Sequence, residues 1–207
     1  MHEPKMQSPL HTFALPALAK PIDGSAGAWG NEVPLLGYIS LRGNAGDGTF
    51  TDALSGVLGV DLPVKACMFV QSAGLKVLWL SPDEWLIVCP RKDRDGLLAK
   101  LSTALKGIKS QVVDNAGGFT QILLKGPHAA DVLSHMSVYD IHALGDGRVV
   151  GTTFGKSSIY LHREADGFAL LLRRSFADYI WRCLVRAAAP YGFGVARLDG
   201  AAAGEAK

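Results

Sequence analysis

An internal repeat limits the folds open to this chain more than any other feature of its sequence. Residues 38–43 (Tyr-Ile-Ser-Leu-Arg-Gly) alternate in polarity and end in a basic residue followed by glycine. Residues 121–126 (Gln-Ile-Leu-Leu-Lys-Gly) end in the same way. Alternation with a period of two is typical of a β-strand, and a repeated segment indicates a repeated structural unit. The chain is therefore expected to fold as two similar halves.

The segments that follow these two strands also match in pairs. The pairs are 51–54 with 131–133, 77–80 with 158–161, 84–88 with 167–171, and the helical stretches 93–106 and 176–189. They predict a unit of one strand, a short helix, three strands and a long helix, which occurs twice and gives eight strands. Strands joined by short turns pair antiparallel. We therefore expect an α+β fold with mainly antiparallel sheets, a first half-repeat over 36–106, and a linker with the second half-repeat over 107–192.

Both ends of the chain differ in composition from the repeats. Five prolines fall within residues 1–35, together with a Gly-Ser-Ala-Gly-Ala run from Gly24. Proline fixes one backbone dihedral and lacks an N–H donor, so this density disfavours helices and strand ladders. We expect residues 1–35 to form an extended arm whose apolar side chains lie on a protein surface. We expect residues 193–207 to form a C-terminal tail that is disordered over Ala201–Lys207.

Charge and hydropathy argue against several functional classes. The 207 residues carry a formal net charge of +2, which argues against a nucleic-acid-binding surface. The longest apolar runs are about five residues, whereas a membrane-spanning helix needs about 20. The first residues lack the apolar stretch of a secretory signal, and the three cysteines have no C-x-x-C spacing. We expect a cytoplasmic protein that binds neither nucleic acid nor membrane.

No pattern of catalytic residues stands out. His128, His135 and His142 recur at intervals of seven residues, which would place them on one face of a single long helix. The repeat requires a break near 137–140, and no carboxylate accompanies them at a spacing that zinc sites use, so surface or packed histidines are favoured. The glycine-rich residues 43–48 lack the lysine of a phosphate-binding loop and are typical of a turn. We expect no catalytic residue, no cofactor-binding residue and no metal ligand in this chain.

Arg173 and Arg174 are the most conspicuous charged pair, directly before a helix that begins near residue 176. Two cations oppose the dipole of that helix, which favours anions at its N-terminus, and would recruit a carboxylate from a partner chain or a ligand. Strand-end arginines that face water are the alternative. We take Arg173 and Arg174 as the candidate partner interface. Trp85 and Trp181 fall at apolar periodic positions and are expected in the core.

Several segments resemble known families. Residues 113–133, which begin Val-Asp-Asn-Ala-Gly-Gly-Phe-Thr, resemble the opening of the folate-binding glycine-cleavage aminomethyltransferases. A fuller resemblance is to the gamma-subunit family of the heterotetrameric sarcosine oxidases. It rests on residues 80–87 (Leu-Ser-Pro-Asp-Glu-Trp-Leu-Ile), 155–163 (Gly-Lys-Ser-Ser-Ile-Tyr-Leu-His-Arg) and 173–181 (Arg-Arg-Ser-Phe-Ala-Asp-Tyr-Ile-Trp). The resemblance covers about residues 35–192, and its last segment is the most specific.

The resemblance implies a role within a complex. Such enzymes oxidise sarcosine to glycine and hydrogen peroxide and pass the methyl carbon to tetrahydrofolate. The family implies an alpha subunit with NAD and the folate site, a beta subunit with FAD and FMN, and a delta subunit with zinc. It implies for the gamma subunit an aminomethyltransferase-like fold without a cofactor. We therefore expect a non-catalytic structural subunit whose arm and one apolar face pack on the alpha and beta subunits.

Two alternatives remain open from the sequence. The first is a free-standing folate-binding protein or aminomethyltransferase. Those proteins orient folate with an acidic residue, and the corresponding stretch here, residues 152–160, contains none. The second is a gamma-like subunit of a related amine dehydrogenase that acts on another N-methyl substrate, since the substrate contacts are expected on the beta subunit.

Overall fold

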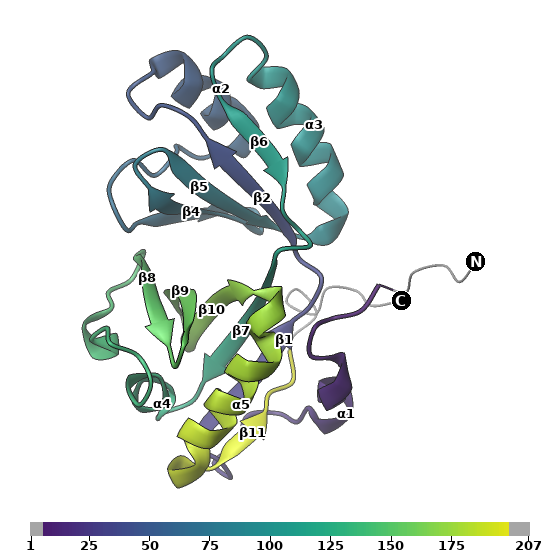
Figure 1. Cartoon of the computed structure of the whole chain (residues 1–207), viewed down its shortest axis with the longest axis vertical. Coiled ribbons are helices and arrows are strands. Elements are labelled where there is room, and N and C mark those ends of the chain that lie inside the picture. Colours follow the sequence, from purple (N-terminus) through teal and green to yellow (C-terminus); the bar gives the residue numbers. More distant parts are fainter. Residues whose placement is uncertain (1–5, 199–207) are drawn as a thin grey trace. The chain divides into compact units, whose positions relative to one another are not determined.

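The computed structural model describes residues 6–198, and within them the chain forms two compact units (Figure 1). We call them the β2 unit and the β7 unit, after the strand that opens each repeat. The β2 unit consists of Leu36–Phe119 and Gly145–Gly151. The β7 unit consists of the described parts of Met1–Leu35, Thr120–Leu144 and Thr152–Lys207.

The β2 unit is a five-stranded sheet with two main helices. Its elements are β2 (Gly37–Arg42), α2 (Gly48–Leu58), β3 (Phe69–Ser72), β4 (Leu75–Ser81), β5 (Glu84–Cys89), the short η2 (Arg91–Asp93), α3 (Arg94–Ala104) and β6 (Gln111–Asp114). The strand order is β3-β4-β5-β2-β6, and all neighbouring strands of this sheet pair antiparallel. The glycine-rich residues 43–48 form a turn, in which Asp47 caps α2 by accepting a 2.9 Å hydrogen bond from the amide of Thr49.

The β7 unit contains a six-stranded sheet. Its elements are η1 (His11–Phe13), α1 (Leu15–Leu18), β1 (Ala28–Val33), β7 (Phe119–Lys125), α4 (Ala129–Ser134), η3 (Ile141–Ala143), β8 (Val149–Phe154), β9 (Ser157–Glu164), β10 (Gly167–Arg173), η4 (Arg174–Phe176), α5 (Ala177–Ala188), η5 (Ala189–Tyr191) and β11 (Phe193–Val195). The strand order is β11-β1-β7-β10-β9-β8, and residues 149–151 at the start of β8 are assigned to the β2 unit. Among the helices of residues 6–198, none has the length and apolar character that a membrane crossing requires.

The predicted α+β repeat is confirmed. The order β2-α2-β3-β4-β5-α3 in one unit recurs as β7-α4-β8-β9-β10-α5 in the other. The described residues contain eleven strands rather than the expected eight, and the three additional strands β1, β6 and β11 all lie outside the repeated unit. The local sequence pattern therefore predicted the repeated elements but not the strands that extend each sheet.

Two of the additional strands are exchanged between the units. Strand β1 leads directly into β2 along the chain, yet it pairs antiparallel with β7 in the six-stranded sheet. Strand β6 leads directly into β7, yet it pairs antiparallel with β2 in the five-stranded sheet. The strand that precedes β2 in the sequence therefore belongs to the sheet of the β7 unit. The strand that precedes β7 belongs to the sheet of the β2 unit.

The expected arm, linker and tail require correction. Residues 1–35 are not simply extended, because they contain η1, α1 and the fully buried strand β1. Residues 107–118 include β6, and the expected tail begins with β11. Prolines at 4, 9, 16, 21 and 34 all fall outside β1 and so leave its ladder intact. The predicted disorder over Ala201–Lys207 concerns residues outside those that the structure describes.

Glycines allow β1 and β11 to lie side by side. These strands run parallel, with Trp29 opposite Gly194 and Ala28 opposite Phe193. A Cβ atom at Gly30 would lie 2.7 Å from the ring of Phe193, and one at Gly194 would overlap the indole of Trp29. Each glycine thus makes room for an aromatic ring of the neighbouring strand, a close approach that a larger side chain would block.

The core of the β2 unit lies between its sheet and its helices. Alternate residues of the strands, such as Ile39 and Leu41 of β2, pack with Phe50 and Leu54 of α2. Trp85 of β5 is fully buried in this core, as predicted. Trp181, on α5 of the other unit, is also buried, with 3% of its surface exposed. Both tryptophans therefore contribute to the core of their own unit.

Candidate partner interface

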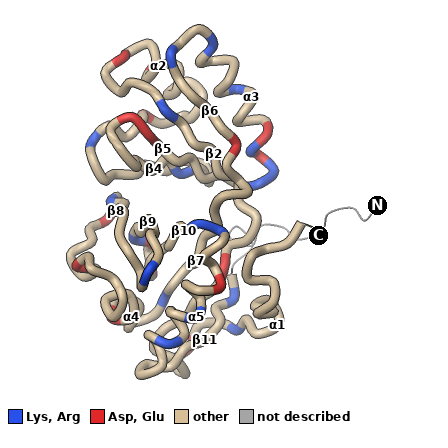
Figure 2. The backbone as a smooth tube through the Cα atoms, viewed as in Figure 1, with Lys and Arg blue, Asp and Glu red and all other residues tan. Residues whose placement is uncertain are grey.

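The two arginines of the candidate interface have different surroundings. Arg173 is the last residue of β10 and is exposed, whereas Arg174 opens η4 and is half-buried. One Nη2 hydrogen of Arg174 is donated to the backbone carbonyl of Gln7. Arg174 thus binds a segment of its own chain. The two arginines therefore differ in their contacts and do not form a single cationic site. Both signs of charge occur in each unit (Figure 2).

Residues 7–18, which we call the N-terminal segment, lie on the β7 unit itself. Leu10 and Leu15 are buried, with 1% and 4% of their surfaces exposed. The Phe13 ring lies 6.1 Å from the Trp181 ring, and the Arg182 guanidinium lies 5.1 Å from the centre of the Phe13 ring. Leu10, Phe13 and Leu15 are therefore used within this chain, whereas Leu18 is 54% exposed.

A buried carboxylate fastens the N-terminal segment to the sheet. Glu32 of β1 is 4% exposed and accepts hydrogen bonds from the hydroxyls of Ser8 and Thr120, the latter at 2.6 Å. Next to it, Asn31 donates a 2.6 Å hydrogen bond to the carbonyl of Ala196. A buried charge needs such partners to offset its lost hydration. Sequence reasoning missed this cluster, because Ser8, Glu32 and Thr120 are far apart in the chain.

Two of the three regularly spaced histidines meet at one aspartate. Nδ1 of His128 lies 2.8 Å and Nε2 of His142 lies 3.4 Å from the two carboxylate oxygens of Asp131 on α4. The hydrogen bond with His128 lowers the pKa of the Asp131 carboxyl, and the nearby His142 and His135 act in the same direction. The third, His135, lies 3.2 Å from the hydroxyl of Tyr191. Over residues 6–198, no group of His, Cys, Asp and Glu has the arrangement of a metal site.

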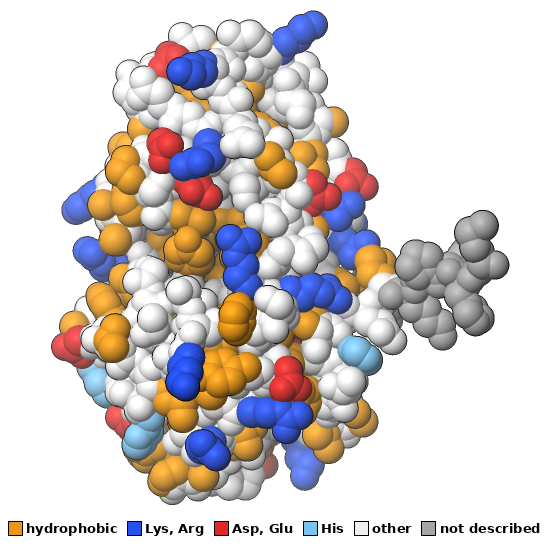
Figure 3. Space-filling view, in the orientation of Figure 1, with side chains coloured by type: hydrophobic (Ala, Val, Ile, Leu, Met, Phe, Trp, Pro, Cys, Tyr) orange, Lys and Arg blue, Asp and Glu red, His pale blue; other side chains and the backbone are white. Residues whose placement is uncertain are grey.

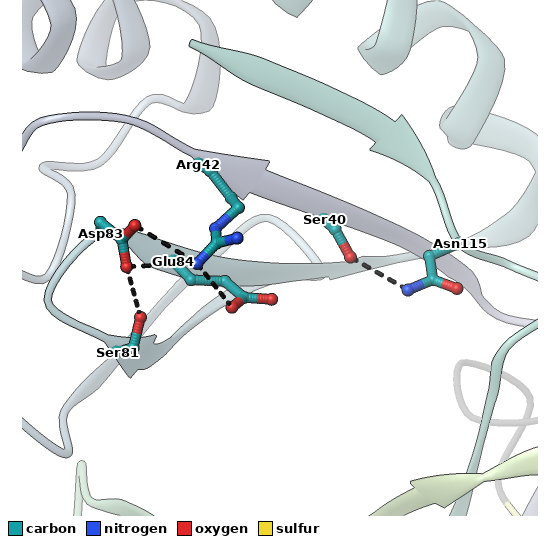
Figure 4. A network of polar contacts seen from close by, with 6 residues as sticks. All are labelled: Ser40, Arg42, Ser81, Asp83, Glu84 and Asn115. Carbon is teal, nitrogen blue, oxygen red and sulfur yellow. Dashed lines mark hydrogen bonds and ion pairs between the residues drawn. The ribbon is translucent and has the colours of Figure 1, made fainter.

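A second polar network lies on the β2 unit (Figure 4). Nη2 of Arg42 is 3.3 Å from Oδ2 of Asp83 and 3.7 Å from Oε2 of Glu84, across the β4–β5 turn. The Ser81 hydroxyl donates to Asp83 at 2.8 Å and, with Arg42, lowers the pKa of the Asp83 carboxyl. The Asp83 carboxyl, with its lowered pKa, favours the charged form and pairs with Arg42, so it holds the turn rather than serves as a proton donor.

Comparison of the sequence with known proteins identifies the family of this chain. The model of the sarcosine oxidase, gamma subunit family matches residues 42–190. The chain belongs to this family. This gamma-family chain is 33% identical over 144 residues to the sarcosine oxidase subunit gamma of an Arthrobacter species, and the match covers 68% of each chain.

Solved structures show the fold of the gamma family and of its wider relatives. A chain of the heterotetrameric sarcosine oxidase from Corynebacterium sp. U-96, solved with pyrrole 2-carboxylate, is similar with a TM-score of 0.81 and 27% identity, over 94% of this chain and 99% of that one. The glycine cleavage system aminomethyltransferase T of Bartonella henselae has the same fold over 86% of this chain and 56% of that chain, with a TM-score of 0.64 and 19% identity. The expected aminomethyltransferase-like fold is therefore confirmed.

Proposed function

We propose that this chain is the structural gamma subunit of a heterotetrameric sarcosine oxidase. That enzyme oxidises sarcosine to glycine, with formation of hydrogen peroxide and methylene-tetrahydrofolate, in the cytoplasm. The observation that carries the proposal is the similarity to a chain of a heterotetrameric sarcosine oxidase over 94% of this chain and 99% of the other. A similarity that extends over nearly the whole of both chains supports a common place in a common assembly.

In this proposal the chain itself has no catalytic role and holds no cofactor. FAD, FMN, NAD, tetrahydrofolate and zinc belong to the alpha, beta and delta subunits, which are its partners; nucleic acid and membranes are not. The arrangement of the polar residues supports this division. The carboxylates of Asp83 and Asp131 are already paired with Arg42 and His128. The buried carboxylate of Glu32 is held by the hydroxyls of Ser8 and Thr120.

Arg173 and Arg174 remain our candidates for the partner interface, with different tasks. Arg173 is exposed at the end of β10 and remains a candidate contact with another subunit. Arg174 acts indirectly, because it holds Gln7 and thereby the start of the N-terminal segment. Charged groups at the rim of an interface guide association more than they add affinity.

Co-expression with the other subunits tests the proposal directly. A tagged copy of this chain should co-purify with the alpha, beta and delta subunits and elute with them as one species on gel filtration. A chain that elutes as a monomer in the presence of all three subunits would overturn the proposal.

The shared fold of the aminomethyltransferases supports one other function, folate binding by the free chain. Isothermal titration calorimetry of the isolated chain with tetrahydrofolate separates the two. We expect no heat of binding, because residues 152–160 offer no carboxylate to the pterin ring. Micromolar binding would favour the folate-binding protein.

A further inference from the structure

Helices α3 and α5 occupy the same place in the two repeats, but their exposed faces differ. The helix α3 follows β5, and α5 follows β10 after the short η4. The exposed positions of α3 carry small or polar side chains, namely Asp95, Gly96, Ala99, Lys100, Ser102 and Thr103. Those of α5 and the residue before it are Phe176, Asp178, Tyr179, Arg182, Val185 and Arg186. Because both helices serve the same architecture, the fold does not require aromatic and arginine side chains on the outside of α5.

Two aromatic rings are exposed at the start of α5. Phe176 is 45% exposed and Tyr179 is 36% exposed. They are three residues apart, a spacing that places side chains next to each other on a helix surface. The Tyr179 hydroxyl accepts a 2.9 Å hydrogen bond from the amide of Lys156, in the turn between β8 and β9. This bond fixes the ring while it stays accessible, so a partner would lose little entropy by packing on it.

Exposed cations lie further along α5 and in the turn that contacts Tyr179. Arg182 is bound to Asp178 through its Nε at 2.7 Å and lies against Phe13, so it is committed within the chain. Arg186, one turn further along α5, is exposed and has no hydrogen bond or ion pair with any residue of the described range 6–198. Lys156 is also exposed. Figure 3 shows apolar side chains next to Lys and Arg over α5.

We propose that Phe176, Tyr179, Arg186 and Lys156, which we call the α5 face, bind an acidic segment of a partner subunit that also carries an apolar side chain. The inference rests on the proposed function and adds the surface through which this chain joins the assembly. Aromatic residues and arginine are enriched at protein interfaces, and they contribute a large share of the binding free energy. The guanidinium of Arg186 matches a carboxylate in shape and charge.

The charges select the partner chemistry. Lys156 adjoins the Tyr179 ring, and Arg186 follows Tyr179 by seven residues on the same helix, while the one acidic side chain of the helix, Asp178, is neutralised by Arg182. A basic partner segment would be repelled by the cations of this face. The carboxylates of an acidic segment would instead form ion pairs with Arg186 and Lys156. An apolar side chain of the partner would cover Phe176 and remove its exposed surface from water.

Charge reversal and ring removal in the full complex test the α5 face. We expect Arg186→Glu and Phe176→Ser each to lower the affinity of this chain for its partner subunits by about tenfold or more, measured by biolayer interferometry against the assembled remaining subunits. The matched controls lie on the β2 unit. Lys100→Glu reverses an exposed charge on α3, and Val64→Ser removes an apolar side chain that is 58% exposed. Both controls should bind within about twofold of wild type.

The ionic strength adds a second measurement. The affinity of the wild type should fall as salt rises from 50 to about 500 mM, and this dependence should be weaker in Arg186→Glu. Circular dichroism melts identify any variant that fails to fold. If both α5 variants bind as the wild type does, the α5 face is not the interface, although the proposed function stands. If the wild type itself does not bind the other subunits, the proposed function fails.

Discussion

The hydroxyl of Thr120 donates a 2.6 Å hydrogen bond to the buried carboxylate of Glu32. Thr120→Val keeps the shape of the side chain but removes this donor, so we expect the free energy of unfolding to fall by about 1–3 kcal/mol. Urea denaturation measures the loss. Thr103→Val is the control, because that hydroxyl is exposed and bonds only its own helix α3. Equal losses in the two variants would mean that Glu32 does not depend on Thr120.

The two buried tryptophans should be costly to truncate. Trp85→Ala and Trp181→Ala should each lower the free energy of unfolding by about 3–5 kcal/mol, because each leaves a cavity. Trp85 also donates a 2.8 Å hydrogen bond from its indole to the carbonyl of Pro63. Trp85→Phe keeps most of the packing and loses that bond, so its loss should be smaller than that of Trp85→Ala. A near-wild-type Trp85→Ala variant would contradict the core assignment.

The arginine pair should separate into two effects. Alanine at both Arg173 and Arg174 should leave the fold intact and weaken assembly with the other subunits on gel filtration. Arg174→Ala alone should also free the carbonyl of Gln7, which loses its donor, and so speed hydrogen exchange at the amides of His11 and Phe13, which are hydrogen-bonded within the N-terminal segment. Arg173→Ala should not change that exchange. An unchanged elution profile of the double variant would mean that neither arginine contributes to the partner interface.

The cysteines should differ in reactivity. Cys89 is 2% exposed, and burial, followed by the charge of Asp93, raises the pKa of its thiol to about 11. At pH 8 its reactive thiolate is therefore scarce. Iodoacetamide should modify the half-buried Cys67 and Cys183 in the native chain before Cys89, as followed by peptide mass spectrometry. Modification of Cys89 at the same rate would contradict its burial.

Asp131 should show the effect of its histidines directly. The hydrogen bond with His128 holds the pKa of the Asp131 carboxyl below its usual value of 3.8. A carboxyl with a lowered pKa in the folded chain stabilises the fold above its ordinary pKa, and this contribution is lost as the pH falls from 3.8 through the lowered value. An NMR titration should give a midpoint below 3.8 for wild type and a higher one for His128→Ala. Identical midpoints would contradict the interaction.

The sequence by itself determined the repeated elements and the class of the fold. Alternation along β2 and the amphipathic pattern of α5 depend on near neighbours in the chain, and the same pattern recurs in both halves. The buried positions of Trp85 and Trp181 followed from the same periodicity. The family followed from segments such as 173–181, whose order of residues is specific.

Only the tertiary structure decided which strands complete each sheet and which polar groups meet. Strand pairing is made by backbone groups that every residue carries, so nothing in residues 111–114 indicates that β6 joins β2 rather than β7. Glu32 reaches Ser8 and Thr120 across 24 and 88 residues of sequence. The hydrogen bond from Arg174 to Gln7 was equally unpredictable, because a local sequence pattern contains no information on distant partners. The exposed rings of Phe176 and Tyr179 appeared only once the buried side of α5 was known.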